Sequence, residues 1–279
     1  MTLSRHLPRS LWLSIGRGLG LGFYFLDSHH RRLALRNLAA AFGPDLSLKQ
    51  RRRTARRSFA HFGGALADFF YLGSLPAEKR NSYIRLKGKH HLMSALAQKK
   101  GVLIFSAHFG LWEMATSLIS RFAPLWVIAR PMDHPLLERK VTRLRRSLGA
   151  RVIPKRDAGR KVLRVLRNKE TAAVLIDQNV LREESVFVDF FGKPASTTPA
   201  LAAFHLRTGA PVLPVFCRLA GQKTWLVDIR PPVAVEKTGN YRRDLVTVTQ
   251  TCTRIIEETI RRHPEQWLWF HDRWRSRPE

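Results

Sequence analysis

The chain has 279 residues, and its hydrophobic fraction of 44% is ample for the core of one large domain, with or without an attached helical region. Its 49 lysines and arginines outnumber 21 acidic residues, giving a formal net charge of +28, so an anionic partner is expected: nucleic acid, an anionic membrane surface, or acidic proteins and phosphorylated substrates. The two cysteines lie far apart, which argues against a disulfide scaffold and fits a reducing compartment.

The first segment, Leu7 to Leu26, is apolar and aromatic but is interrupted by Arg9 and Arg17. It therefore falls short of the roughly 18 to 20 uncharged residues that a membrane-spanning helix needs. Four glycines at alternate positions between 16 and 22 weaken it further, and the small-residue cleavage site of a signal peptide is absent. We expect residues 1–26 to form a short membrane anchor or an interfacial helix, and an ordinary N-terminal core helix is the alternative.

Residues 31–72 have helical periodicity and predict two helices. The first ends at Gly43–Pro44, and Ser47 is placed to cap the second. The second helix is basic at its start and aromatic at its end, so it could lie on a membrane surface or be a core helix with a solvated start. Residues 27–90 are thus predicted to be a helical region.

After Pro76, strand-like runs alternate with helical segments, and residues 91–279 are predicted to form the catalytic core. The expected strands are 102–105, 125–129, 151–153, 172–176, 212–216 and 225–229, and the expected helices are 111–122, 135–148, 159–168, 199–208 and 241–262. This alternation predicts an α/β fold with a mostly parallel central sheet flanked by helices. The last two strands are expected to form a hairpin at Ala220–Gly221.

His108 and Glu113 are the first candidates for chemistry. On one helix they would lie about 140° apart, so if they act together His108 must precede the helix, at the end of strand 102–105, with the turn at Phe109–Gly110. A carboxylate on one imidazole nitrogen leaves the other as a base. The chain has no G-x-S-x-G motif and no paired cysteine motif, so a His–Glu pair would suit activation of a substrate hydroxyl for transfer. The same spacing also occurs by chance.

Further polar residues follow other expected strands. Arg130 follows the second and Asp177–Gln178 the fourth, and ligands gather at the carboxyl ends of parallel strands. We therefore expect these residues to share one rim with His108; a surface arginine and a hydrogen-bonded loop are the alternatives. Gly192 is expected to let a loop approach the site closely. No H-E-x-x-H motif or Cys/His spacing predicts a metal site.

An ordered set of motifs extends over most of the chain. It comprises R-N-L at 36–38, H-F-G-L-W-E at 108–113, R-P at 130–131, D-Q at 177–178, V-x-F-F-G-x-P-A-x-T at 188–197, T-G-A-P-V-L-P-V-F at 208–216 and P-E-Q-W-L-W-F-H at 264–271. The set resembles the late acyltransferases of lipid A biosynthesis, the lauroyl and myristoyl acyltransferase family, within the glycerolipid acyltransferase superfamily. The chain departs from the family in its polar-interrupted N-terminal segment, in its somewhat short length, and in Asp272, where a second basic residue is common.

The resemblance implies transfer of a fatty acyl chain from an acyl-carrier-protein thioester to a hydroxyl of a lipid A precursor, at the cytoplasmic face of the inner membrane and without a cofactor. Its expected partners are the acidic carrier protein, a phosphorylated glycolipid and an anionic membrane surface. His108 would take the hydroxyl proton while Glu113 holds the imidazole tautomer. Arg130, or backbone N–H groups near Phe109–Gly110, would stabilise the oxyanion, and Arg130 could instead bind an acceptor phosphate.

Three other functions remain open from the sequence. A lysophospholipid or other glycolipid O-acyltransferase could use the same His–Glu pair, and a hydrolase could use water as the acceptor. A nucleic-acid-binding protein would fit the charge, but no helix-turn-helix, zinc-finger or RNA-recognition signature accompanies the arginine clusters. Nucleic acid is therefore not expected as a partner.

Overall fold

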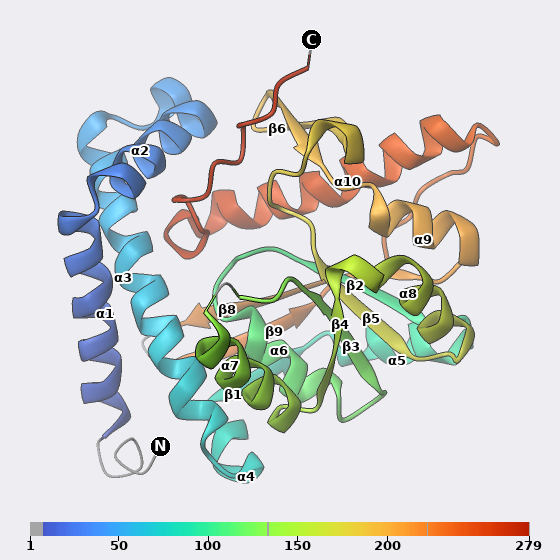
Figure 1. Ribbon diagram of the computed structural model, residues 1–279, viewed down its shortest axis with the longest axis horizontal. Coiled ribbons are helices and arrows are strands. Elements are labelled where there is room, and N and C mark those ends of the chain that lie inside the picture. The colour runs from blue at the N-terminus through green and yellow to red at the C-terminus, as the bar shows by residue number, and fades with distance from the viewer. Residues whose placement is uncertain (1–7, 133, 222, 279) are drawn as a thin grey trace.

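The computed structural model describes residues 8–132, 134–221 and 223–278. Within these residues the centre is a seven-stranded sheet with the order β1-β9-β8-β2-β5-β3-β4, shown in Figure 1. The strands are β1 (Ile84–Lys87), β2 (Val102–Ser106), β3 (Leu125–Ala129), β4 (Ala150–Pro154), β5 (Thr171–Leu175), β8 (Val212–Ala220) and β9 (Thr224–Ile229).

The sheet is parallel except at one hairpin. β2 pairs in parallel with β5 and β8, β3 with β4 and β5, and β1 with β9, whereas β8 and β9 are antiparallel. The predicted mostly parallel sheet and the hairpin at Ala220–Gly221 are thus confirmed. Each of the six strands expected from the sequence is present, within one residue at its start and four at its end.

Helices cover both faces of the sheet. The helices of the core are α5 (Lys89–Ala97), α6 (Trp112–Ile119), α7 (Pro135–Ser147), α8 (Ala158–Arg167), α9 (Ala200–Thr208) and α10 (Tyr241–Arg262). Along β2, Leu103 and Phe105 join the cluster that contains α8, α9 and α10, whereas Val102 and Ile104 join the cluster that contains α5, α6 and α7. The alternation of side chains along a strand therefore fills two separate cores from one continuous apolar run.

Three helices precede the sheet: α1 (Arg9–Leu26), α2 (Ser28–Phe42) and α3 (Leu48–Gly73). Ser47 caps α3 in a capping box with Gln50, as expected. The aromatic end of α3 is part of the core, because Phe59 is 1% and Phe69 4% exposed. Its exposed basic start and buried aromatic end match the core-helix interpretation of this segment.

α1 packs along α3 through small residues. A Cβ added at Gly16 would lie 2.6 Å from the Gly63 carbonyl oxygen, and one at Gly20 would lie 2.1 Å from that of Phe59. The buried Arg9 contacts Asp68 of α3, with Nε 2.9 Å from Oδ1. Arg9, Gly16 and Gly20, which interrupt the apolar segment, therefore serve its packing.

No helix of the described residues is long and apolar enough to cross a bilayer. One side of α1 exposes apolar side chains spaced three or four residues apart: Leu11, Ile15, Leu19, Phe23 and Leu26. We call these five residues the α1 stripe. The start of the expected segment, including Leu7, lies outside the described residues.

Three features were not expected from the sequence. β1 lies within residues 27–90, assigned to a helical region, yet forms an edge of the central sheet beside β9 after the short helix α4 (Ala77–Asn81). Along the chain, the helix α5 lies between β1 and β2. β6 (Val186–Phe190) and β7 (Lys193–Thr197) form a separate antiparallel hairpin.

Candidate active site

His108 lies just beyond the carboxyl end of β2, before α6, as predicted. The turn between them requires Gly110, which has φ of +61° and is packed so closely that a Cβ would lie 1.9 Å from the Cys217 carbonyl oxygen. Gly110 is buried in this turn. Its N–H donates to the Gln266 carbonyl oxygen at 2.8 Å, and that of Phe109 to Ala107 at 2.7 Å. These two N–H groups are therefore engaged within the turn, contrary to the expectation that they face an oxyanion.

Asp177 is the carboxylate that contacts His108. In the parallel pair of β2 and β5, Ser106 is opposite Leu175, and each chain continues two residues further, to His108 and Asp177. Oδ1 of Asp177 lies 2.8 Å from Nδ1 of His108, and Oδ2 accepts hydrogen bonds from the backbone N–H of His108 at 2.9 Å and from Nε1 of Trp267 at 2.8 Å. The imidazole is thus held at one nitrogen.

The charge of Asp177 is stabilised although the residue is only 3% exposed. Burial alone would raise the pKa of this carboxyl. The nearby charge of His108 and the hydrogen bonds from His108 and Trp267 outweigh burial and lower the pKa below its ordinary value. Asp177 therefore remains an ionised acceptor at neutral pH.

Glu113 lies in the first turn of α6, as predicted, but its carboxylate pairs with Arg145 of α7. Nη2 of Arg145 is 2.6 Å from Oε1, and Nε is 3.1 Å and 3.2 Å from Oε1 and Oε2. Burial lowers the pKa of Arg145, but the hydrogen bonds and charge of Glu113 outweigh this effect and raise it. The partner of the His108 ring is thus Asp177, where the sequence had suggested Glu113.

A narrow apolar cavity of about 80 Å³ adjoins the pair of Glu113 and Arg145. Trp112 joins the cavity to the base, because it lines the cavity and its ring centroid lies 5.1 Å from that of His108. Glu113 and Arg145 supply the charged part of the lining, and the buried hydroxyl of Ser106, which also lines it, has no hydrogen-bond partner among the described residues. The apolar lining is supplied by Ile104, Ala115, Ile119, Leu125, Val127, Ile128, Ala129, Ala173, Val174, Leu175 and Val215.

The other residues predicted for the site are Arg130, Gln178 and Gly192. Arg130 is exposed after β3, at the same edge of the sheet as His108. Gln178 is half-buried next to Asp177. Gly192 is exposed in the turn of the β6–β7 hairpin, where its N–H donates to Oδ1 of Asp189 at 3.1 Å.

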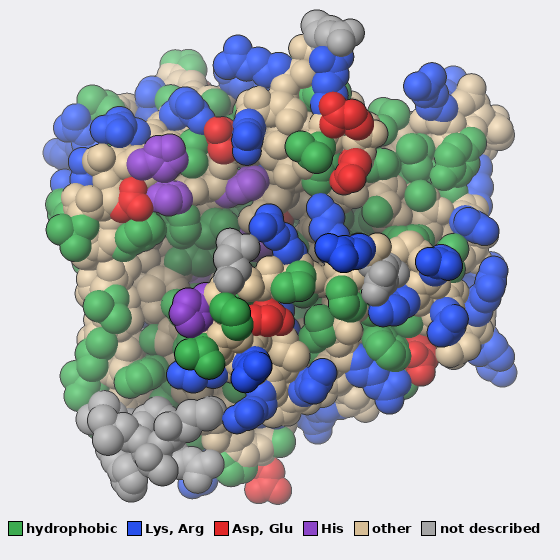
Figure 2. Space-filling view, in the orientation of Figure 1, with side chains coloured by type: hydrophobic (Ala, Val, Ile, Leu, Met, Phe, Trp, Pro, Cys, Tyr) green, Lys and Arg blue, Asp and Glu red, His purple; other side chains and the backbone are tan. Residues whose placement is uncertain are grey.

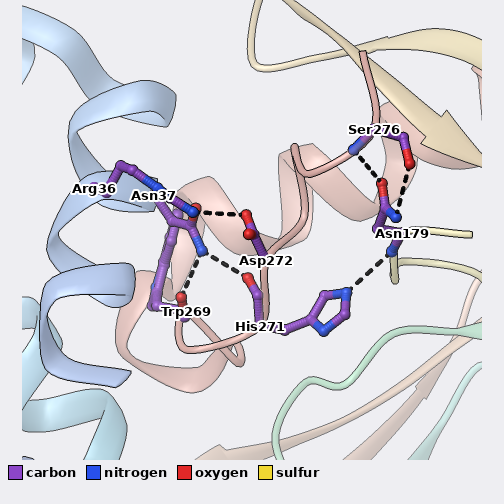
Figure 3. Close-up of polar contacts among 7 residues, drawn as sticks. All are labelled: Arg36, Asn37, Asn179, Trp269, His271, Asp272 and Ser276. Atoms are coloured by element: carbon purple, nitrogen blue, oxygen red, sulfur yellow. Dashed lines mark hydrogen bonds and ion pairs between the residues drawn. The ribbon is translucent and has the colours of Figure 1, made fainter. Parts of the chain in front are cut away.

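The C-terminal segment is hydrogen-bonded to α2 and to the segment that follows Asp177, as Figure 3 shows. Asn37 of α2 donates to the carbonyl oxygens of Trp269 and His271, each at 2.7 Å. Nε2 of His271 accepts from the backbone N–H of Asn179 at 3.0 Å, and the side chain of Asn179 bonds Ser276. Burial lowers the pKa of His271 to about 4, so the ring is a neutral acceptor at pH 7.

Partly exposed aromatic rings continue from the base to α1. Their centroids are 6.2 Å apart for Trp112 and Phe62, 5.6 Å for Phe62 and Phe270, and 6.4 Å for Phe270 and Phe23. Figure 2 shows a hollow on this side of the molecule, with hydrophobic side chains in its depth. Phe23 also belongs to the α1 stripe, so the aromatic series and the stripe meet.

Sequence reasoning missed Arg145, Trp267 and His271 as parts of the site. Trp267 and His271 fell within a motif used only for its resemblance, and Arg145 stood among several arginines of one helix. None of the three positions carries a local signal, because each contact joins segments far apart in the chain.

The chain resembles known acyltransferases over almost its full length. Residues 1–276 match the family model described as bacterial lipid A biosynthesis acyltransferase. The chain is 26% identical to a lipid A biosynthesis lauroyltransferase of Escherichia coli over 98% of this chain and 88% of that protein, and 27% identical to a palmitoleoyltransferase of the same organism over 98% and 87%. A phosphatidylinositol mannoside acyltransferase of Mycolicibacterium smegmatis is 25% identical over 78% and 71%.

Proposed function

The chain belongs to the bacterial lipid A biosynthesis acyltransferase family and is an acyltransferase, and we propose that it uses His108 as the general base for transfer from an acyl-carrier-protein thioester. The acceptor is a hydroxyl of a lipid A precursor. The observation that supports this mechanism is the hydrogen bond between Nδ1 of His108 and the buried carboxylate of Asp177, beside an apolar cavity at the carboxyl end of the sheet.

The reaction follows from which imidazole nitrogen is occupied. Because Asp177 holds Nδ1 of His108, Nε2 is the nitrogen that accepts the proton of the acceptor hydroxyl. The hydroxyl oxygen attacks the thioester carbonyl, and collapse of the tetrahedral intermediate expels the thiolate, which takes the proton back from the imidazolium. A positioned base of this kind contributes about 10² to 10⁴ in rate.

Glu113 contributes to catalysis through Arg145 in this mechanism. The carboxylate holds the guanidinium beside the cavity, where it donates to the oxyanion that develops on the thioester carbonyl. Arg130, exposed at the same edge, is assigned to an acceptor phosphate, since its planar fork matches phosphate oxygens. Gln178 borders the acceptor next to Asp177.

The cavity accepts the end of the acyl chain. Along β3 its lining extends from Ala129, at the edge with the base, to Leu125, about 13 Å further into the sheet. Ile119 of α6 also lines it, six residues beyond Glu113. Apolar contact along this length excludes water from the thioester and strengthens the electrostatic interactions there.

The acceptor approaches from a membrane. The α1 stripe would lie among the lipid chains of an anionic leaflet, at the cytoplasmic face of the inner membrane, and the chain's net charge of +28 favours that surface. From there the aromatic series through Phe270 and Phe62 offers an apolar path to His108.

The experiment is product analysis by mass spectrometry. Membranes containing the wild-type protein or His108→Ala are incubated with acyl-carrier-protein thioester and a tetra-acylated lipid A precursor. A mass gain of one acyl chain, absent with His108→Ala, is the expected result. No gain with either protein would contradict the proposal.

A second acceptor class is favoured by one comparison. The relative named phosphatidylinositol mannoside acyltransferase covers 78% of this chain, so another glycolipid hydroxyl is the alternative substrate. Acylation of such a glycolipid or of a lysophospholipid, with no gain on the lipid A precursor, would identify it. Free fatty acid released independently of any acceptor would instead indicate a hydrolase.

A further inference from the structure

A basic groove lies between α2 and the C-terminal segment 272–278. It consists of two adjoining hollows of about 660 Å³ and 480 Å³, which share Arg36, Asp272 and Arg275 in their walls. Lys193 and Pro194 of β7 border the larger hollow. We call the two hollows together the tail groove.

The walls of the tail groove carry a large excess of positive charge. Its cations are Arg32, Arg36, Lys193, Arg275 and Arg277, with His29 at one end. Among its described lining residues Asp272 is the only acid, and it pairs with Arg36 at 2.8 Å. His29, Arg32 and Arg36 are three and four residues apart, so they form one stripe along α2.

The form of the groove fits a protein helix better than a single phosphate. Phosphate sites converge backbone N–H groups or a bidentate arginine on one point, whereas the basic side chains of α2 are spread along about 10 Å of the helix, from His29 to Arg36, and the others come from β7 and the C-terminal segment. Between them lie apolar side chains, Leu33, Ala40, Pro194, Trp274 and Pro278. A polar rim around an apolar centre that includes a tryptophan is the usual composition of a protein interface.

The groove is connected to the catalytic pair through few residues. Asn37, which lines the groove, binds the carbonyl oxygen of His271, and Nε2 of His271 binds the N–H of Asn179. Asn179 is two residues from Asp177 and also bonds Ser276, between the two arginines of the tail. A partner bound in the groove therefore sits beside the edge of the sheet where His108 lies.

We propose that the tail groove docks an acidic helix of the protein that carries the acyl group. The proposal rests on the proposed function, in which the donor is a thioester of an acidic carrier protein. Acidic side chains at helical spacing would face the cations of α2 on one side and those of the tail on the other, and long-range attraction would speed the encounter.

The test compares two donors of the same acyl group, one on acyl carrier protein and one on a small pantetheine thiol, with one glycolipid acceptor in detergent. Arg32→Glu with Arg275→Glu is expected to raise the KM for the protein-borne donor about tenfold, through slower association that worsens with salt, and to leave the small donor unchanged. Arg52→Glu with Arg53→Glu, exposed on α3 outside the groove, makes the same change in net charge and is expected to leave both KM values unchanged.

Other outcomes would overturn the proposal. Equal losses with both donors would show a structural effect of the two substitutions. A raised KM for the phosphorylated acceptor alone would assign the groove to acceptor phosphates, and reduced binding to anionic vesicles with unchanged donor kinetics would assign it to the membrane. The proposed function fails separately, when the wild-type protein transfers neither donor's acyl group to any hydroxyl.

Discussion

Asp177 holds His108 at two points, the ring and the backbone. Oδ1 contacts Nδ1 of the ring at 2.8 Å, while Oδ2 accepts the backbone N–H at 2.9 Å. A ring fixed in this way keeps one tautomer and one orientation, because rotation of either residue would break a hydrogen bond to a buried charge.

Asp177→Asn is expected to lower kcat by about 10³ to 10⁴ while the protein still folds, because the amide favours the wrong imidazole tautomer. Initial rates of acyl transfer measure the effect, and near-ultraviolet circular dichroism verifies folding. Trp267→Phe, which removes only the third hydrogen bond to Asp177, serves as the milder comparison. Near wild-type activity in Asp177→Asn would contradict the role given to this carboxylate.

The pair of Glu113 and Arg145 predicts a strongly coupled double-mutant cycle. Their side chains are 11% and 16% exposed, so Glu113→Gln or Arg145→Met alone leaves a buried charge and is expected to cost about 3 kcal/mol of unfolding free energy. The double variant is expected to recover much of that stability and none of the activity. Urea unfolding and transfer rates measure the two quantities, and additive stability losses would show that the pair is not coupled.

Gly20→Ala and Gly18→Ala are expected to act in opposite directions. A Cβ at position 20 meets the Phe59 carbonyl oxygen at 2.1 Å, which forces α1 from α3 and is expected to cost about 1–3 kcal/mol. Nothing lies within 4 Å of a Cβ at position 18, so alanine there gains helix propensity of up to about 1 kcal/mol. Both are read from urea unfolding midpoints, and a shift of the same sign in both would refute the packing described for α1.

His271 predicts a dependence of stability on pH. Burial holds its pKa at about 4, below the ordinary 6.5. Between these values the unfolded chain binds a proton that the folded chain excludes, so the free energy of unfolding falls as pH drops from 6.5 to about 4. His271→Gln keeps an acceptor for Asn179 but does not titrate, and its stability is expected to vary less across that window. Urea unfolding at a series of pH values tests this, and parallel curves would contradict it.

The α1 stripe predicts lipid binding without a role in folding. Leu19 and Leu26 are 71% and 88% exposed, so Leu19→Ser with Leu26→Ser is expected to leave the melting temperature unchanged. Because these two leucines would be buried among the lipid chains, their loss is expected to weaken binding to anionic vesicles by about tenfold or more. Co-sedimentation measures this, with Tyr241→Ser, an exposed position on α10, as the control. Unaltered vesicle binding would show that the α1 stripe does not contact the membrane.

The sequence was sufficient for elements with a clear period and insufficient for contacts between distant segments. The strand of residues 125–129 and the helix of residues 241–262 were predicted to the residue, because each has a continuous pattern with clear ends. β1 was missed because its four residues read Ile-Arg-Leu-Lys, too short to separate from the helices around it. The β6–β7 hairpin was missed because the apolar run of β6 is short and is interrupted by Asp189.

In the candidate site, too, local features were predicted and contacts between distant segments were not. His108 was located at a strand end because the strand and turn are local. Its partner depended on which strand lies beside β2, and strand order is not contained in periodicity. Given β5 as the neighbour, the register of Ser106 with Leu175 is enough to place Asp177 beside His108. Glu113 was favoured instead because it was the nearest carboxylate along the chain.

The contact of Arg9 with Asp68 bears on how the N-terminus can be handled in experiments. Asp68 is fully buried and is also held by Nε1 of Trp225 at 2.7 Å, in the core beneath β9. A shortened chain that begins after Leu26 would leave this carboxylate without its countercharge and would uncover the glycine-lined face of α3. Trimming the protein to improve its yield would thus remove part of its interior, and inactivity of such a fragment would say nothing about membrane attachment.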